Sequence, residues 1–220
     1  MAATDVVGQS VIHGRVYFEG AVPAPKVFSV ASDPACATGG GELRRAENVV
    51  MNRNGALKNV FVYVSKGLED FSFAPPSTPI VLDQKDCRFV PRVLGIQAGQ
   101  PLRILNSDST FHNVHALAKR NKAFNLGMTI KSPESRRVFV APEVVVPLRC
   151  NVHPWMGAYL GVVEHPFYAV TDSAGFFSLP HLRAGHYTIE AWHEEFGRLS
   201  QEVFVGEGEI KTLMFAFPTD

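Results

Sequence analysis

The stretch that decides the fold is VVVPLRCNVHPWMGAYLGVVE, residues 144–164. Its two apolar ends, 144–149 and 158–164, are predicted strands, because short β-branched runs bounded by turn residues are typical of buried β-structure. The loop between them carries Cys150, His153 and Met156. A thiolate, an imidazole and a thioether so close together could bind a soft metal ion. The spacing C-x-x-H-x-x-M alone is a weak signal, since an inert buried thiol would also explain the cysteine.

The remaining sequence repeats the β pattern of this stretch. Helical periodicity is nearly absent, and short apolar alternations recur between clusters of Gly, Pro, Asn and Asp. The chain is therefore predicted to be all-β. Further strands are expected at residues 10–18, 57–64, 80–82, 89–96, 102–106, 138–140, 168–171, 176–179, 186–192, 200–205 and 211–217.

Charge and hydropathy exclude some partners. Lysine and arginine together number 21, as do aspartate and glutamate, so we expect no nucleic-acid partner. The most apolar stretch, residues 138–148, is too short to span a bilayer and contains Pro and Glu, so we expect no direct membrane span. No export signal follows Met1. An exported protein of this sequence would have lost its signal.

Three cysteines suggest one disulfide and one thiol kept apart. Cys36 and Cys87 both lie in polar, turn-like surroundings, where an oxidising compartment would let them pair. Two unpaired thiols in a cytosolic protein remain the alternative, because sequence cannot show the geometry that a bridge requires. Cys150 is the thiol that we expect to stay free.

A Pro-rich stretch at residues 70–79 and the pair His165-Pro166 predict two domain boundaries. The tail TDSAGFFSL (171–179) with LRAGHYTI (182–189) resembles the carboxypeptidase regulatory-like domains, which are transthyretin-like sandwiches. The head supplies the strands that this tail lacks, HGRVYF (13–18) and LKNVFVYV (57–64). We therefore predict one discontinuous sandwich of residues 8–76 with 166–220, and a second domain at residues 77–165 inserted into it.

The inserted segment resembles the cupredoxins, and most closely amicyanin and plastocyanin. CRFVPRVLGIQAGQPLRILNSD (87–108) is similar to the opening hairpin of that family, FHNVH (111–115) contains its H-N-V, and CNVHPWMG (150–157) is similar to the short ligand loop of amicyanin. One departure is Val152, where the family often has proline, and it could loosen the loop slightly.

This resemblance implies a cupredoxin Greek-key β-sandwich that binds one type 1 copper ion per chain. The metal ligands would be His112, Cys150, His153 and Met156. Asn113 would tie the two ligand-bearing loops together near the Cys150 sulfur. Pro154 and Trp155 would surround the exposed edge of His153, where redox partners of related proteins dock.

Three further points concern the metal. His112 and His115 both lie near the loop, and the resemblance places the ligand directly before the asparagine, at His112. A binuclear copper centre needs two cysteines in the loop, and a multicopper oxidase or nitrite reductase needs further histidine pairs. Both signatures are missing. The tail holds a further set of histidines and glutamates that could build a second metal site but is better explained as strand and turn residues: His165, His181, His186, His193, Glu190, Glu194 and Glu195.

The function expected from these features is single-electron transfer by Cu(I)/Cu(II) cycling, in a periplasmic or otherwise extracytoplasmic protein without substrate turnover of its own. Its partner would be a c-type cytochrome, a dehydrogenase, or a larger membrane-associated electron-transfer complex. The alternative is a structural or binding subunit in which the fold is a scaffold and copper is incidental. Copper storage or delivery fits less well, because a buried thiolate site releases its ion slowly.

Overall fold

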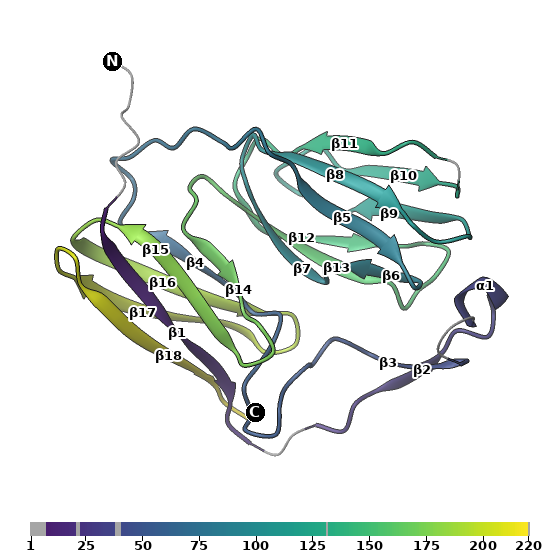
Figure 1. The fold of residues 1–220 in the computed structure, drawn as a ribbon, viewed down its shortest axis with the longest axis horizontal. Helices are drawn as coiled ribbons and strands as arrows, with labels where there is room; N and C mark the ends of the chain where they lie inside the picture. The colour runs from purple at the N-terminus through teal and green to yellow at the C-terminus, as the bar shows by residue number, and fades with distance from the viewer. Residues whose placement is uncertain (1–7, 21–22, 38–40, 131, 220) are drawn as a thin grey trace. The chain divides into compact units, whose positions relative to one another are not determined.

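A computed structural model describes residues 8–20, 23–37, 41–130 and 132–219. The chain forms two compact units, each assembled from separated segments (Figure 1). Almost all regular structure is β-strand, as the sequence predicted. Within the described part of the chain, no helix has the length and apolar character needed to cross a membrane.

The first unit contains the chain up to Pro23, Asn48–Ala74 and His165–Asp220. Its strands form two sheets, in the orders β15-β1-β18 and β14-β4-β16-β17. The bounds are β1 Ser10–Phe18, β4 Phe61–Lys66, β14 Tyr168–Val170, β15 Phe176–Leu182, β16 Gly185–His193, β17 Gly197–Val205 and β18 Ile210–Phe217.

Both sheets of this unit join the head of the chain to its tail. Strand β1 runs parallel to β18 and antiparallel to β15, and β4 lies antiparallel to β14 and β16. Gly14 sits at the tightest point of β1, where a Cβ would lie 1.8 Å from the carbonyl oxygen of Leu213. No other residue fits so close to a neighbouring backbone. Alternate residues of β16 are buried, including Tyr187 and Ile189, which gives the sheet one face toward the core.

The second unit contains Ala24–Glu47 and Pro75–Glu164. A five-stranded sheet, β10-β9-β12-β13-β7, and a four-stranded sheet, β11-β8-β5-β6, contribute to one apolar core. The strand bounds are β5 Ile80–Lys85, β6 Arg88–Val90, β7 Val93–Gln97, β8 Pro101–Asn106, β9 His112–Ala116, β10 Phe124–Met128, β11 Ser135–Val138, β12 Glu143–Arg149 and β13 Gly157–Val163. A small hairpin of β2 (Val27–Ser29) and β3 (Leu43–Arg45) and the helical turn α1 (Pro34–Ala37) complete the unit.

Several element predictions differ from the structure. Strand β4 begins at Phe61 and not at residue 57, because Asn59 has a φ of 65°, which no strand residue adopts. The strand predicted at residues 89–96 is two strands interrupted at Pro91, which has no N–H to donate to a ladder. Strand β10 was not predicted, because its Asn125 and Gly127 break the apolar pattern.

The structure also corrects the predicted domain limits. Residues 24–47 were assigned to the first domain, and they belong to the second unit. They are attached there by the disulfide between Cys36 and Cys87 and by an ion pair of 2.8 Å between Glu47 and Arg88. The remaining boundaries move by one or two residues, to Ala74/Pro75 and Glu164/His165.

Candidate metal centre

Strand pairing brings the candidate ligands to one edge of the five-stranded sheet. His112 is the first residue of β9, and Cys150 directly follows β12. These two strands are antiparallel neighbours, with Leu148 opposite Ala116 and Arg149 opposite His115. The start of β9 therefore lies beside the end of β12, and the loop from Cys150 to β13 closes over the same edge.

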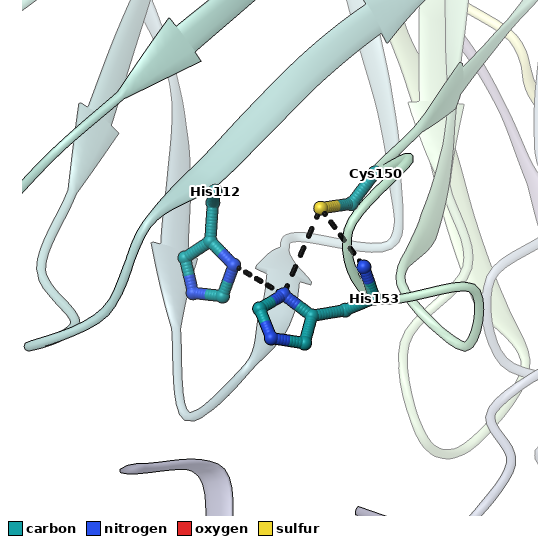
Figure 2. Close-up of side chains that lie close together, drawn as sticks. All are labelled: His112, Cys150 and His153. Atoms are coloured by element: carbon teal, nitrogen blue, oxygen red, sulfur yellow. Dashed lines mark hydrogen bonds between the residues drawn. The ribbon is translucent and has the colours of Figure 1, made fainter. Parts of the chain in front are cut away.

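Three of the predicted ligands form one buried cluster (Figure 2). Nδ1 of His112 lies 2.9 Å from Nδ1 of His153, which lies 3.8 Å from Sγ of Cys150. The backbone N–H of His153 also donates to that sulfur, at 3.4 Å. The exposed fractions are 0% for His112, 3% for Cys150 and 2% for His153, so the cluster is closed to bulk water.

Met156 closes the loop that carries Cys150 and His153. The backbone N–H of Cys150 donates to the carbonyl of Met156 at 3.2 Å, and the N–H of Met156 donates to the carbonyl of His153 at 2.9 Å. The Met156 side chain is 1% exposed and belongs to the apolar core of this unit. These two bonds fix the loop independently of any ligand.

Asn113 connects the strand that bears His112 to the loop that bears Cys150. Its side-chain oxygen accepts from the backbone N–H of Asn151 at 2.7 Å and lies 3.4 Å from Sγ of Cys150. Its side-chain nitrogen donates to Asn125 at 2.6 Å. The side chain is buried, and its oxygen connects β9 to the loop that begins with Cys150.

Two carboxylates that the sequence analysis gave no role complete the surroundings. Asp108 lies 2.8 Å from Nε2 of His112, and Asp33 lies 2.9 Å from Nε2 of His153. Asp108 precedes His112 by four residues and could have been noticed from that spacing. Asp33 is separated from His153 by 120 residues, and no local pattern points to it.

The charges in this cluster are coupled. Burial lowers the pKa of His112, but its contacts with Asp108 and Cys150 outweigh burial and raise the pKa to about 9. Burial raises the pKa of Cys150, but hydrogen bonds from His112 and from backbone N–H groups lower it to about 6. Hydrogen bonds from the histidines also lower the pKa of Asp33 and Asp108, against the effect of burial.

These shifts indicate where the protons lie. His112 carries both ring protons at neutral pH, so its Nε2–H donates to Asp108 and its Nδ1–H donates to Nδ1 of His153. Nε2 of His153 donates to the carboxylate of Asp33, which can only accept. The Nδ1 atoms of the two rings face each other, and that of His153 lies 3.8 Å from the sulfur of Cys150.

His115 lies outside the cluster. Its Nδ1 is 3.2 Å from the side-chain oxygen of Asn151, and its side chain is half-buried. It lies one residue past Val114 on β9, whereas His112 lies at the strand's start. The structure thus places His112, and not His115, beside Cys150 and His153.

The expectation that His153 has an exposed edge is wrong. Its ring is 2% exposed, because residues 24–47 cover it and place Asp33 on its Nε2. Trp155 is partly buried between its neighbours: its ring lies 5.1 Å from His153 and 5.9 Å from Phe28, and its Nε1–H donates to the carbonyl of Cys87 at 3.2 Å. Pro154 is exposed. Partner docking at Pro154 and Trp155 stays a prediction.

The cysteines divide into one pair and one free thiol. Cys36 and Cys87 form a disulfide with their Cα atoms 5.5 Å apart, and Cys150 is free and buried.

The tail's candidate metal ligands lie in the first unit. The first and last of its histidines are buried there: His165 lies 2.8 Å from the carbonyl of Val64, and His193 stacks on Phe196. Among the described residues, every cluster of three or more potential metal ligands lies in the second unit.

Comparison with known proteins gives partial likenesses. No family model matches the chain, and a search of curated proteins finds no match. Among solved structures, a Cu-containing nitrite reductase from Thermus scotoductus is 19% identical, with a TM-score of 0.37 over 46% of this chain and 25% of its own length. This chain therefore spans about a quarter of that protein.

Two smaller proteins are matched over nearly their whole length. A purple cupredoxin from Nitrosopumilus maritimus is 21% identical, with a TM-score of 0.32 over 37% of this chain and 97% of its own. A mutant of amicyanin in its Cu(I) form is 20% identical, with a TM-score of 0.35 over 46% of this chain and 97% of its own. These values describe a likeness of fold, and the interpretation of the site depends on its own residues.

The donor atoms of the cluster suit a soft metal ion. One thiol and two imidazoles present atoms within 4.8 Å of one another, and all three side chains are buried. Thiolate and imidazole together select copper, zinc or iron, whereas hard cations prefer oxygen ligands. A methionine on the same loop distinguishes the set further, because a weak thioether ligand beside two histidines and a cysteine is typical of copper electron-transfer sites.

Proposed function

We propose that the chain is a type 1 copper protein that carries single electrons between redox partners. The observation that supports this most directly is the buried cluster of His112, Cys150 and His153, closed by a loop that ends at Met156. His112 and His153 would hold the ion through Nδ1, Cys150 through Sγ, and Met156 would be the weak fourth ligand. When bound there, copper would supply a one-electron couple between Cu(I) and Cu(II).

The protein's own contribution is rigidity. The ligand loop is closed by backbone hydrogen bonds between Cys150, His153 and Met156, and Asn113 fixes it to the neighbouring strand. Ligands held by such contacts keep one arrangement, so a change of redox state would require little movement. Electron transfer between proteins benefits from that rigidity, and burial keeps water from the reactive sulfur.

Compartment and partner are parts of the same proposal. A disulfide between Cys36 and Cys87 persists in an oxidising compartment and is rare in the cytosol, which favours a periplasmic or other extracytoplasmic location. The partner would be a c-type cytochrome, a dehydrogenase or a larger membrane-associated electron-transfer complex. Because the ring of His153 is covered, electrons would pass through Trp155 or Asp33, which contact it.

A second candidate is a structural or binding subunit in which copper is incidental. The burial of His153 favours it, because a partner cannot touch the ring directly. The two candidates differ in their response to Trp155→Ala and Cys150→Ser. An electron carrier with either substitution would exchange electrons with its partner slowly or not at all, whereas a structural subunit would keep its association with the complex.

The experiment that tests copper binding is titration of the full chain with Cu(II), followed by visible absorption and metal analysis. We expect one copper per chain and an intense thiolate-to-copper band that ascorbate bleaches. The band should be lost in Cys150→Ser and lost or shifted in His112→Ala. The matched control is His115→Ala, which alters a histidine on the same strand and should keep the band. A colourless protein that binds no copper, or zinc alone, would contradict the proposal.

A further inference from the structure

Both candidate histidine ligands have a carboxylate on the ring nitrogen that faces away from the cluster. Asp108 lies 2.8 Å from Nε2 of His112, and Asp33 lies 2.9 Å from Nε2 of His153. The two Nδ1 atoms face each other at 2.9 Å. Each imidazole therefore contacts a carboxylate oxygen through Nε2, and its Nδ1 lies on the side of the ring nearer Cys150.

The carboxylates are themselves fixed. One oxygen of Asp108 accepts from the backbone N–H of Asp86 at 2.7 Å, and the other accepts from the N–H of Cys87 at 2.8 Å. Asp33 accepts from the N–H of Ala35 at 2.9 Å and from the hydroxyl of Thr110 at 2.8 Å. An acceptor held by several donors keeps its position and its charge, so it can orient the ring that it contacts.

The disulfide links the two carboxylate arms. Cys36 lies three residues after Asp33, and Cys87 donates its N–H to Asp108. The ligand atoms of Asp33, Cys36 and His153 lie within 4.8 Å of one another, as do those of Cys87, Asp108 and His112. The bridge thus fastens the segment that brings Asp33 to the hairpin that anchors Asp108.

We propose that Asp33 and Asp108 are positioning residues that fix both imidazoles with Nδ1 toward the metal and favour Cu(II) over Cu(I), so that this centre has a lowered reduction potential. This inference rests on the proposed copper function. A carboxylate that accepts a hydrogen bond from Nε2–H makes the imidazole a stronger electron-pair donor to the metal at Nδ1. A negative charge close to the metal also stabilises the more highly charged ion.

The test uses the full chain and three variants of Asp33. Asp33→Asn keeps an oxygen that can accept from His153 but removes the charge, Asp33→Ala removes both, and Asp33→Glu restores the charge. The matched control is Asp86→Asn. Asp86 is exposed on the loop beside Cys87, so this variant also removes one carboxylate charge from the neighbourhood of the cluster but contacts neither imidazole. Copper content and the visible band are recorded first, and the reduction potential second.

We expect Asp33→Asn to keep the band and to lower the ratio of Cu(II) affinity to Cu(I) affinity by about tenfold, within the range typical of residues that hold metal ligands. A tenfold change corresponds to a potential about 59 mV more positive for a one-electron couple. Asp33→Ala should also shift the band, Asp33→Glu should restore much of the potential, and Asp86→Asn should change it much less. Equal shifts in Asp33→Asn and Asp86→Asn would overturn the inference.

A second measurement does not depend on copper. Nitrogen-15 NMR of the metal-free protein reports which ring nitrogen of His153 is protonated and whether its proton is protected from exchange. We expect a protected Nε2–H in the wild type that exchanges at least tenfold faster in Asp33→Ala, since exchange accelerates when a buried hydrogen bond is lost. If the Nε2–H of His153 exchanges at the same rate in Asp33→Ala as in the wild type, the positioning role of Asp33 is overturned. Absence of copper from a wild type that shows the protected proton would count against the proposed function instead.

Discussion

The side-chain oxygen of Asn113 lies 2.7 Å from the backbone nitrogen of Asn151. This bond joins β9, which begins with His112, to the loop that begins with Cys150. One buried amide therefore holds together two candidate ligands that are far apart in the sequence. Its contribution can be measured in the second unit alone, because the chain has two tryptophans, of which Trp192 belongs to the first unit and Trp155 to the second.

Asn113→Ala should destabilise the second unit by about 1–3 kcal/mol, because it removes two hydrogen bonds worth about 0.5–1.5 kcal/mol each, one from the N–H of Asn151 and one to Asn125. Urea unfolding followed by Trp155 fluorescence in a Trp192→Phe background measures the change. The control is Asn125→Ala, which removes the exposed partner of the same side chain and should cost less than about 1 kcal/mol. Equal costs in the two variants would show that the bond to Asn151 does not hold the loop.

The double variant Cys36→Ser/Cys87→Ser should lower the free energy of unfolding of the second unit by about 4 kcal/mol, the loop-entropy value for a bridge of this span. The two residues are 51 apart in the sequence, so the bridge restricts the unfolded chain strongly. The same fluorescence measurement applies. Dithiothreitol should produce a similar loss in the wild type and none in the double variant. If dithiothreitol lowers the free energy of unfolding of the double variant as well, the reductant acts on something other than this disulfide.

Glu143→Ala should destabilise the second unit by about 3 kcal/mol, since hydrogen bonds to a charged acceptor are worth more than neutral ones. The carboxylate accepts from the backbone N–H groups of Lys119, Arg120 and Asn121 and is 9% exposed. Glu134→Ala is the control, because Glu134 forms ion pairs near the surface with arginines. It should change stability by less than about 1 kcal/mol.

Glu143 also predicts a pH dependence. Burial raises its pKa, but the bonds from Lys119 and Asn121 outweigh burial, so the pKa lies below the ordinary 4.5. A depressed pKa adds stability that is present above 4.5 and is lost as the pH falls further. Unfolding of the second unit measured from pH 6 to pH 3 should show this loss in the wild type and a smaller one in Glu143→Gln. If the free energy of unfolding falls equally with pH in the wild type and in Glu143→Gln, the pH dependence does not come from Glu143.

His165 predicts an acid sensitivity of the first unit. Burial lowers its pKa to about 4, and the hydrogen bond from its Nε2–H to the carbonyl of Val64 offsets this only in part. Its Nδ1 accepts from the N–H of Phe167, which requires that this nitrogen carry no proton. The unfolded chain binds a proton near pH 6.5 and the folded chain only near 4, so stability falls over that interval. The loss should reach about 3 kcal/mol at pH 4.

The measurement is unfolding at a series of pH values, followed by Trp192 fluorescence in a Trp155→Phe background. His165→Gln keeps a donor and an acceptor without the titration and should remove most of the slope between pH 6.5 and 4. His186→Gln alters an exposed histidine on β16 and should leave the slope as it is. Identical slopes in wild type and His165→Gln would contradict the role of His165.

The parts of the site that could be predicted from the sequence are those that local spacing encodes. Cys150, His153 and Met156 lie on one loop between two apolar runs, so their proximity follows from the chain itself. Asp33 could not be predicted, because its contact with His153 depends on a segment folding back over 120 residues. The covering of His153 depends on the same segment, and this explains why its exposure was predicted wrongly.

The fold shows the same division. Alternating strands such as β16 were predicted because every second side chain must be buried on one face. Strand β10 was not, because its pairing with β9 stabilises a segment whose own residues, Asn125 and Gly127, do not favour a strand. The limits of residues 24–47 depend on which cysteines pair, and sequence alone does not determine this.

The bridge between Cys36 and Cys87 also decides which atoms a metal ion could meet. Before oxidation, the ligand atoms of Cys36 and Cys87 would belong to thiols next to His153 and His112 respectively. A soft ion arriving then would find three competing thiolates around two imidazoles, a donor set that suits zinc or an iron–sulfur cluster. Once the bridge has closed, Cys150 is the one free cysteine among the three. Closure of the bridge therefore leaves the sulfur of Cys150 and the two imidazoles as the soft donors of the cluster.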